Sequence, residues 1–209
     1  MSHLLHLAAS PRGAASESLA IAGTFLDVYR QHHPDDTVET WDLWDGTLPS
    51  FGPAAAGAKM AVFGGAEPAG EQATAWRAAR AAFERFDAAD RLLLSVPMWN
   101  GGIPYVLKQF IDVVSQPGMV FGVDPVTGYS HLLAGRGKRA AVVYTSAVWG
   151  PALGPEFGRD FQSTYLEDWL TWTGIDDISE IRFHPTLVGD VVEARTKAHA
   201  VARDVAATF

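Results

Sequence analysis

Apolar positions along this chain follow two different periods. Continuous or alternating apolar runs, which are typical of strands in a sheet, occupy residues 3–9, 37–43, 91–97, 138–145 and 178–186. Between them, apolar side chains recur at spacings of three and four, which predicts amphipathic helices, over residues 19–29, 71–86, 103–114, 161–172 and 191–205. Strands and helices therefore alternate along the chain.

This alternation predicts the α/β class, with a parallel sheet covered by helices on both faces, because parallel strands need crossover connections. The chain has 209 residues, without an internal repeat or a clear boundary. We therefore expect a single domain over residues 1–209.

Two stretches interrupt the pattern. Residues 52–70 are rich in Ala and Gly and contain two prolines, which favours a long loop with only a short helical piece at 59–62. Residues 117–137 combine turn-forming and aromatic residues and predict a hairpin excursion.

Composition narrows the classes of function. The net charge of −8 argues against a nucleic-acid partner, which would need clustered Lys and Arg. The absence of cysteine excludes disulfides and thiolate chemistry. No apolar run approaches the roughly 18 residues of a membrane span, and the start "MSHLLHLAAS" does not resemble a signal peptide. We expect a cytoplasmic protein without a membrane partner.

Ligands of open parallel sheets bind beyond the carboxyl ends of the strands. Three segments follow strands at that edge: a first loop (residues 10–18), a second loop (97–102) and a third loop (145–150). The first loop, "SPRGAASES", offers hydroxyls at a helix start, where free N–H groups favour a phosphate. It lacks the glycine patterns of P-loops and dinucleotide folds, and an ordinary helix cap explains it equally well.

The second loop lies in "SVPMWNGGIP" and places two bulky side chains close to two glycines. Met98 and Trp99 could contact a planar ring, while Asn100 offers a donor and an acceptor to its edge, and Gly101 lets the backbone approach closely. A strand-to-helix turn with a packed aromatic residue is the alternative. The third loop, in "TSAVWGP", adds a hydroxyl, a Trp and a turn.

The segments "SPRGAASES", "VPMWNGGIPYVLKQFIDVV" and "GKRAAVVYTSAVWGP" resemble the FMN-dependent NADH azoreductases within the flavodoxin-like NAD(P)H:quinone oxidoreductases. The similarity extends over nearly the whole chain, and "PMWNGGIPYVLK" is its most specific part. The resemblance implies a three-layer α/β/α sandwich with a five-stranded parallel sheet of order 2-1-3-4-5. It also implies bound FMN, NADH or NADPH as electron donor, and a homodimer with active sites at the subunit interface.

The resemblance also implies site residues. The FMN phosphate would be held by the first loop, with Glu17 acting through its backbone amide, and the implied residues are Ser10, Arg12, Ser16, Glu17 and Ser18. The ring would be lined by residues of the second and third loops: Met98, Trp99, Asn100, Gly101, Ser146 and Trp149. Many members of that family have Ser-Arg-Gly-Gly and a nearby His after the fourth strand, whereas this chain has Ser146-Ala147-Val148-Trp149. This difference puts the preference for azo acceptors in question more than the binding of flavin.

The predicted activity is two-electron hydride transfer through FMN to a quinone, azo or nitro compound, with no catalytic side chain because the flavin carries the hydride. Phe121, Trp149 and Phe161 are candidate walls for flat acceptors, with core or interface packing as the alternative. A flavodoxin-like electron carrier and an NADH:flavin reductase serving a monooxygenase remain alternative functions. His32, His33, Asp35 and Asp36 are better explained by a helix end than by a metal site, so no metal is expected.

Overall fold

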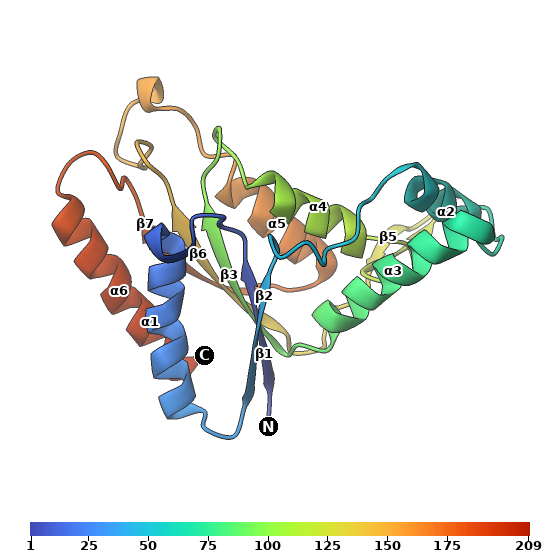
Figure 1. Ribbon diagram of the computed structural model, residues 1–209, viewed down its shortest axis with the longest axis horizontal. Helices are drawn as coiled ribbons and strands as arrows, with labels where there is room; N and C mark the ends of the chain where they lie inside the picture. The colour runs from blue at the N-terminus through green and yellow to red at the C-terminus, as the bar shows by residue number, and fades with distance from the viewer.

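The computed structural model describes residues 1–209 and forms three layers (Figure 1). Five parallel strands make the central sheet in the order β2-β1-β3-β6-β7. Their bounds are β1 His3–Ala8, β2 Thr37–Asp42, β3 Arg91–Pro97, β6 Arg139–Thr145 and β7 Asp177–Phe183. Strands β4 (Phe121–Asp124) and β5 (Gly128–His131) are not part of this sheet, because they pair antiparallel in a separate hairpin. The predicted α/β class with a five-stranded parallel sheet and the hairpin excursion are confirmed.

Helices cover both faces of the sheet (Figure 1). One face carries α1 (Glu17–His32) and α6 (Val191–Thr208). The other carries α3 (Gly70–Asp87), α4 (Tyr105–Val114) and α5 (Ser163–Thr173). Burying both faces explains the continuous apolar runs of the central strands.

Alternate residues of each central strand serve the two cores. In β3, Leu93 packs under α1, whereas Leu92 and Leu94 face the larger core beneath α3, α4 and α5. The central strands β1, β3 and β6 are almost fully buried, because they have helices on both sides. A few polar side chains lie among them: burial lowers the pKa of His6 to about 4, and its Nε2 lies 2.6 Å from Ser95 Oγ.

Residues 52–70 correct one expectation, since most of them form helix α2 (Pro53–Phe63) rather than a long loop. Pro53 occupies the first turn, where its missing N–H costs nothing, and an alanine run follows. Ala58 is buried against Trp76 of α3, so small side chains allow the two helices to approach closely. Tertiary packing therefore overrode the Gly and Pro content that had favoured a loop.

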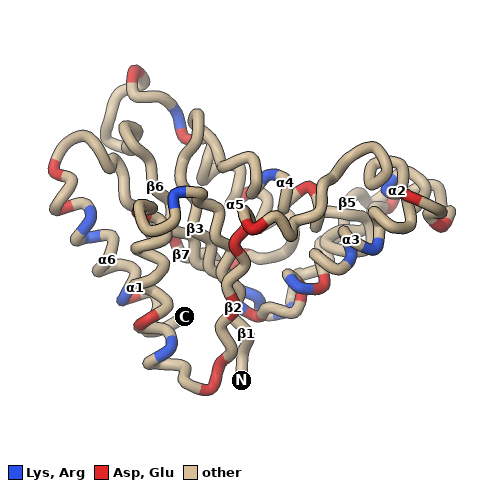
Figure 2. The backbone as a smooth tube through the Cα atoms, in the orientation of Figure 1, with Lys and Arg blue, Asp and Glu red and all other residues tan.

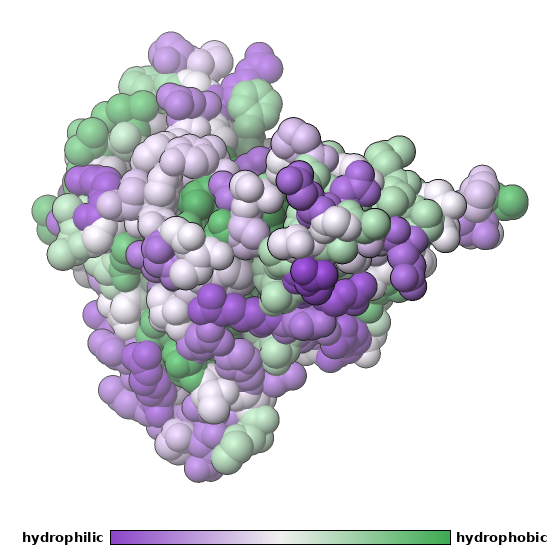
Figure 3. All heavy atoms as spheres, turned by 45° about the vertical axis from the view of Figure 1, so that its right-hand side comes forward, coloured by the Kyte–Doolittle hydropathy of each residue, from purple (hydrophilic) through white to green (hydrophobic).

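Helices α2 and α3 and the β4–β5 hairpin form an arm on one side of the sheet, at the right of Figure 1. Figure 2 shows acidic and basic residues interspersed along both the arm and the sheet side. Much of the face seen when the arm is turned forward is hydrophilic, with apolar residues in scattered groups (Figure 3). No helix combines the length and the apolar character needed to cross a bilayer.

Gly174 ends α5 in a left-handed conformation with φ of 101°, and a Cβ there would lie 2.3 Å from the Ala134 backbone nitrogen. We expect Gly174→Ala to lower the free energy of unfolding by about 3 kcal/mol or more, because strain and overlap add. Gly23, inside α1 with open space around its Cβ position, is the matched control. Gly23→Ala should raise stability by up to about 1 kcal/mol. Urea denaturation followed by circular dichroism measures both, and equal midpoints for the two variants would contradict this account.

Candidate functional site

The parallel register brings the three predicted loops to one edge of the sheet, the upper edge in Figure 1. Ala8 pairs with Ser95, and Pro97 pairs with Thr145, so β1, β3 and β6 end at nearly the same level. The Met98 N–H then donates to the Thr145 carbonyl oxygen at 2.6 Å. The second and third loops are therefore held side by side.

The first loop leads into α1 through a short 3-10 turn, Gly13–Ala15. Ser16 is the N-cap, and its Oγ accepts a hydrogen bond from the Leu19 N–H at 3.3 Å and lies 3.1 Å from Ser18 Oγ. Ser10, Ser16 and Ser18 are all buried. The backbone N–H groups of Glu17 and Ser18 form no hydrogen bond outside the helix, and the first turn of a helix offers them no partner inside it. The loop therefore presents free donors and a positive helix end, which together suit an anion.

The two charged residues of this loop behave differently. The Glu17 carboxylate turns to α6, where Arg195 donates to it at 2.5 Å. Arg12 is exposed and makes no ion pair within the chain. The carboxylate is thus neutralised by Arg195, and the free guanidinium of Arg12 adds positive charge beside the helix start.

The second loop is a tight two-residue turn. Trp99 and Gly102 exchange backbone hydrogen bonds of 2.8 and 3.0 Å, and the intervening Asn100 and Gly101 have φ of 50° and 84°. Positive φ at both central positions is typical of the type I′ turn, for which Asn-Gly is a favoured pair. The turn holds Trp99 partly exposed, at 37%, so an aromatic surface and an amide side chain lie side by side.

Trp44 was not among the predicted site residues. It lies two residues beyond β2, and its Nε1 donates to the Ala9 carbonyl oxygen at 3.0 Å, just before the first loop. Its ring packs against Trp99 and Tyr105, with centroid distances of 6.0 and 5.0 Å. Trp44 therefore connects the first and second loops. Its place after a strand that ends at this edge was the signal in the sequence, since β2 is parallel to β1.

The third loop is fixed by a hydrogen bond within the loop and by contacts with the segment that follows β7. The Ser146 hydroxyl donates to the Trp149 carbonyl oxygen, and the Ser146 carbonyl accepts from the Thr186 N–H at 2.8 Å. The Trp149 ring packs against His184, with centroids 5.0 Å apart. Burial lowers the pKa of His184, and the nearby positive charge of Arg182 lowers it further, so the neutral ring is favoured. Ser146 thus shapes the loop, while Trp149 stays half-buried at the edge.

A fourth segment, the strap (residues 158–161), crosses beside the second loop. The Phe161 N–H donates to the Gly101 carbonyl oxygen at 3.0 Å. Phe161 had been assigned to a helix, but α5 begins only at Ser163, with Gln162 as its N-cap residue. Both oxygens of Asp160 accept from Ser163, through its N–H at 2.8 Å and its hydroxyl at 2.6 Å.

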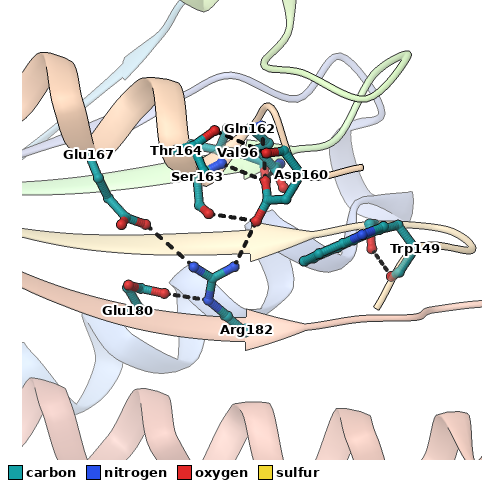
Figure 4. Close-up of polar contacts among 10 residues, drawn as sticks. Val96, Trp149, Asp160, Gln162, Ser163, Thr164, Glu167, Glu180 and Arg182 are labelled. Atoms are coloured by element: carbon teal, nitrogen blue, oxygen red, sulfur yellow. Dashed lines mark hydrogen bonds and ion pairs between the residues drawn. The ribbon is translucent and has the colours of Figure 1, made fainter. Parts of the chain in front are cut away.

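A charged cluster fixes the strap to the sheet (Figure 4). Arg182 of β7 bonds to Asp160 and to Glu167 of α5, each at 3.4 Å, and also to Glu180. Burial acts to raise the pKa of Asp160, but hydrogen bonds from Ser163 and Gln162 outweigh it and hold the pKa below its usual range. Burial raises the pKa of Glu167, with a further contribution from Glu180.

The strap and the second loop separate two pockets. The smaller, of about 240 Å³, lies between the second and third loops and is lined by Met98, Asn100, Gly101, Ala147, Val148, Trp149, Phe157, Gly158 and Arg159. The larger, of about 430 Å³, is lined by Trp99, Asn100, Gly102, Ile103, Tyr105, Lys108, Phe161 and Tyr165. Phe161 and Trp149 thus line different pockets.

Phe121 is not part of this edge within one chain. It is 4% exposed and lies in the arm, where it packs against Phe63, Tyr129 and Trp172 with centroid distances of 6.2, 5.5 and 5.0 Å. Within one chain Phe121 therefore lies apart from Trp149 and Phe161, because the hairpin packs against α2 and α5, and its role as an acceptor wall stays a prediction.

The arrangement suits a ligand with an anionic end and a planar ring. The first loop offers free N–H groups and a positive helix end, and the second and third loops offer aromatic and amide groups. The smaller pocket has no carboxylate, imidazole or hydroxyl side chain among its lining residues. Acid–base or nucleophilic chemistry by the protein is therefore not what this pocket provides, and reactivity would have to come from a bound group.

Comparisons with known proteins agree with this fold. The family model described as flavodoxin-like fold matches residues 2–206. An FMN-dependent NADH:quinone oxidoreductase of Ruegeria pomeroyi is 45% identical over 93% of this chain and 94% of its own. Another, from Nitratidesulfovibrio vulgaris, is 38% identical over 100% of both chains. The crystal structure of an azoreductase from Bacillus anthracis superimposes with a TM-score of 0.89 at 25% identity, covering 100% of each chain. The chain therefore belongs to the flavodoxin-like fold family, among relatives that are FMN-dependent NADH:quinone oxidoreductases.

Proposed function

We propose that this protein is an FMN-dependent NADH:quinone oxidoreductase that also reduces azo compounds. The observation that carries the proposal is the pairing, at one sheet edge, of an anion-binding helix start with a ring-binding turn. The 45% identical relative is named for the same activity, and an azoreductase structure shares the fold. We further propose that residues 1–209 act as one domain.

The residues fit FMN at both ends. The buried hydroxyls of Ser10, Ser16 and Ser18 and the free amides at the start of α1 would hold the phosphate, with Arg12 beside it. Glu17 would contribute its amide only, because its carboxylate is engaged with Arg195. These donors act on an anion without crowding it.

The ring would lie on the second and third loops. Met98 and Trp99 would give it flat apolar contact, Asn100 would bond to its polar edge, and the absence of a side chain at Gly101 leaves space for its approach. FMN bound there would supply hydride transfer from NADH to the acceptor. The chain's own contribution is to orient the ring, with Trp149 lining the smaller pocket and Phe161 lining the larger one beside it.

An NADH-reactive enzyme and a simple electron carrier make different predictions. We expect the purified protein to bind FMN, and NADH to bleach the bound flavin under anaerobic conditions in stopped-flow measurements. A quinone or azo compound added next should restore the oxidised spectrum. Bound flavin that NADH reduces only with a separate reductase present would identify a carrier, and a protein that gains no FMN on incubation would contradict the proposal.

The two ends of the site can be tested separately with FMN and riboflavin, which lacks the phosphate. Ser16→Ala should weaken FMN binding about tenfold, the loss of one charge-assisted hydrogen bond, and leave riboflavin binding unchanged. Asn100→Gly should weaken the binding of FMN and of riboflavin by the same factor, since Gly keeps the positive φ of the turn and removes only the side-chain amide. Quenching of flavin fluorescence gives the dissociation constants.

Ser16 also caps α1, so its variant needs a control that loses a cap elsewhere. Asp190 caps α6 by accepting from the Glu193 N–H at 2.9 Å. Asp190→Ala should reduce stability by about 1 kcal/mol, as expected for a lost cap, without altering either dissociation constant. A loss of riboflavin binding in Ser16→Ala equal to the loss of FMN binding would show that Ser16 does not act on the phosphate.

We also propose a homodimer, with the arm of each subunit reaching toward its partner's site. Exposed apolar side chains support it: Val126 and Met60 on the arm are 92% and 66% exposed, and Tyr105 and Phe161 at the edge are 64% and 61% exposed. Such surfaces are commonly covered by association. Sedimentation velocity should give about twice the chain mass of 22.5 kDa, and Met60→Asp with Val126→Asp should shift it toward the monomer. A monomer mass for the unaltered protein would rule the dimer out.

A further inference from the structure

Arg159 is the one charged residue among those that line the smaller pocket. Its carbonyl oxygen lies 3.7 Å from the position that a Cβ of Gly101 would take. Its side chain is exposed and forms no ion pair or hydrogen bond within the chain. The one charged residue that lines the pocket between the second and third loops is therefore unpaired.

Neither acidic residue beside Arg159 in the chain pairs with it. Asp160 uses both oxygens on Ser163, Gln162 and Arg182 (Figure 4). Glu156 is exposed and forms no ion pair within the chain. The chain has 24 acidic residues against 16 Lys and Arg, so a shortage of carboxylates does not explain the free guanidinium.

The backbone just C-terminal to Arg159 is fixed by hydrogen bonds of Phe161 and Gln162. The Phe161 N–H bonds to the Gly101 carbonyl oxygen at 3.0 Å, and Gln162 Nε2 donates to the Val96 carbonyl oxygen at 2.7 Å. The strap is thus tied both to the ring-binding turn and to the end of β3. A guanidinium on an anchored backbone keeps its charge near one place, although the side chain itself remains free to move.

Opposite Arg159, the third loop supplies no charge of its own. Ala147, Val148 and Trp149 line that side of the pocket, and none of them can bear a positive charge. Positive charge at the ring would therefore have to come from the strap. An anion formed in this pocket would find Arg159 as its charged neighbour.

We propose that Arg159 stabilises the negative charge that the flavin ring gains on reduction; this rests on the proposed function. NADH gives up a hydride, which is two electrons and one proton, and leaves as NAD⁺, so the flavin acquires one negative charge. A quinone then takes up the same hydride and one proton from water to form the hydroquinone, and the charge is removed. Arg159 favours the reduced form because a cation close to an anion in a partly enclosed pocket lowers its free energy.

The test is the midpoint potential of bound FMN, measured by dye equilibration at pH 7, together with the dissociation constants of oxidised and reduced FMN. Arg159→Gln should weaken binding of reduced FMN about tenfold more than that of oxidised FMN, which for a two-electron couple lowers the potential by about 30 mV. Arg159→Lys, which keeps the charge, should restore most of the difference.

Arg80 provides the matched control, because it also lacks an ion pair but lines a separate pocket beside α3. Arg80→Gln should leave the potential unchanged. An unchanged potential in FMN-loaded Arg159→Gln, an equal fall in both glutamine variants, or an equal loss of oxidised and reduced FMN would each overturn the proposal. Failure of the unaltered protein to bind FMN would instead overturn the proposed function, and this inference with it.

Discussion

The structure depends on the alignment of three strands that are buried on both faces. Because β1, β3 and β6 run parallel and are covered by helices on each side, their register cannot slip without exposing apolar side chains. The same alignment makes the strands end together, and the loops that follow must meet at one edge. Each core residue that fixes the register therefore also fixes the site, even where it lies far from any ligand.

Most of the fold followed from periodicity. The apolar strands and the helices with repeats of three and four were predicted correctly, because burial on one or two faces imposes those patterns directly. Helix α2 was not, since its stability comes from contact between Ala58 and Trp76, and no local pattern records that contact. The start of α5 was placed two residues early, because the hydrogen bonds from Ser163 to Asp160 depend on a turn whose geometry the sequence alone does not specify.

The site could be predicted where a loop directly follows a strand. The Ser16 cap and the Asn100–Gly101 turn were found in this way, because serine at a helix start and Asn-Gly in a tight turn have local physical reasons. Trp44 and Arg159 were missed, as they reach the site through tertiary contacts across the sheet edge. The separation of Phe121 from Trp149 and Phe161 within one chain was not foreseen for a related reason: aromatic character does not say which cluster a residue joins.

Arg12 and Arg159, the arginines without an ion pair on the first loop and the strap, have a consequence that precedes any contact with a ligand. The chain carries a net charge of −8, so a small anion in dilute solution experiences repulsion from most directions. Arg12 and Arg159 add positive charge at the sheet edge. Their field acts over roughly the 8 Å of screening length in physiological salt. They therefore attract anions toward this edge, and rising ionic strength weakens the attraction while the pocket itself stays the same.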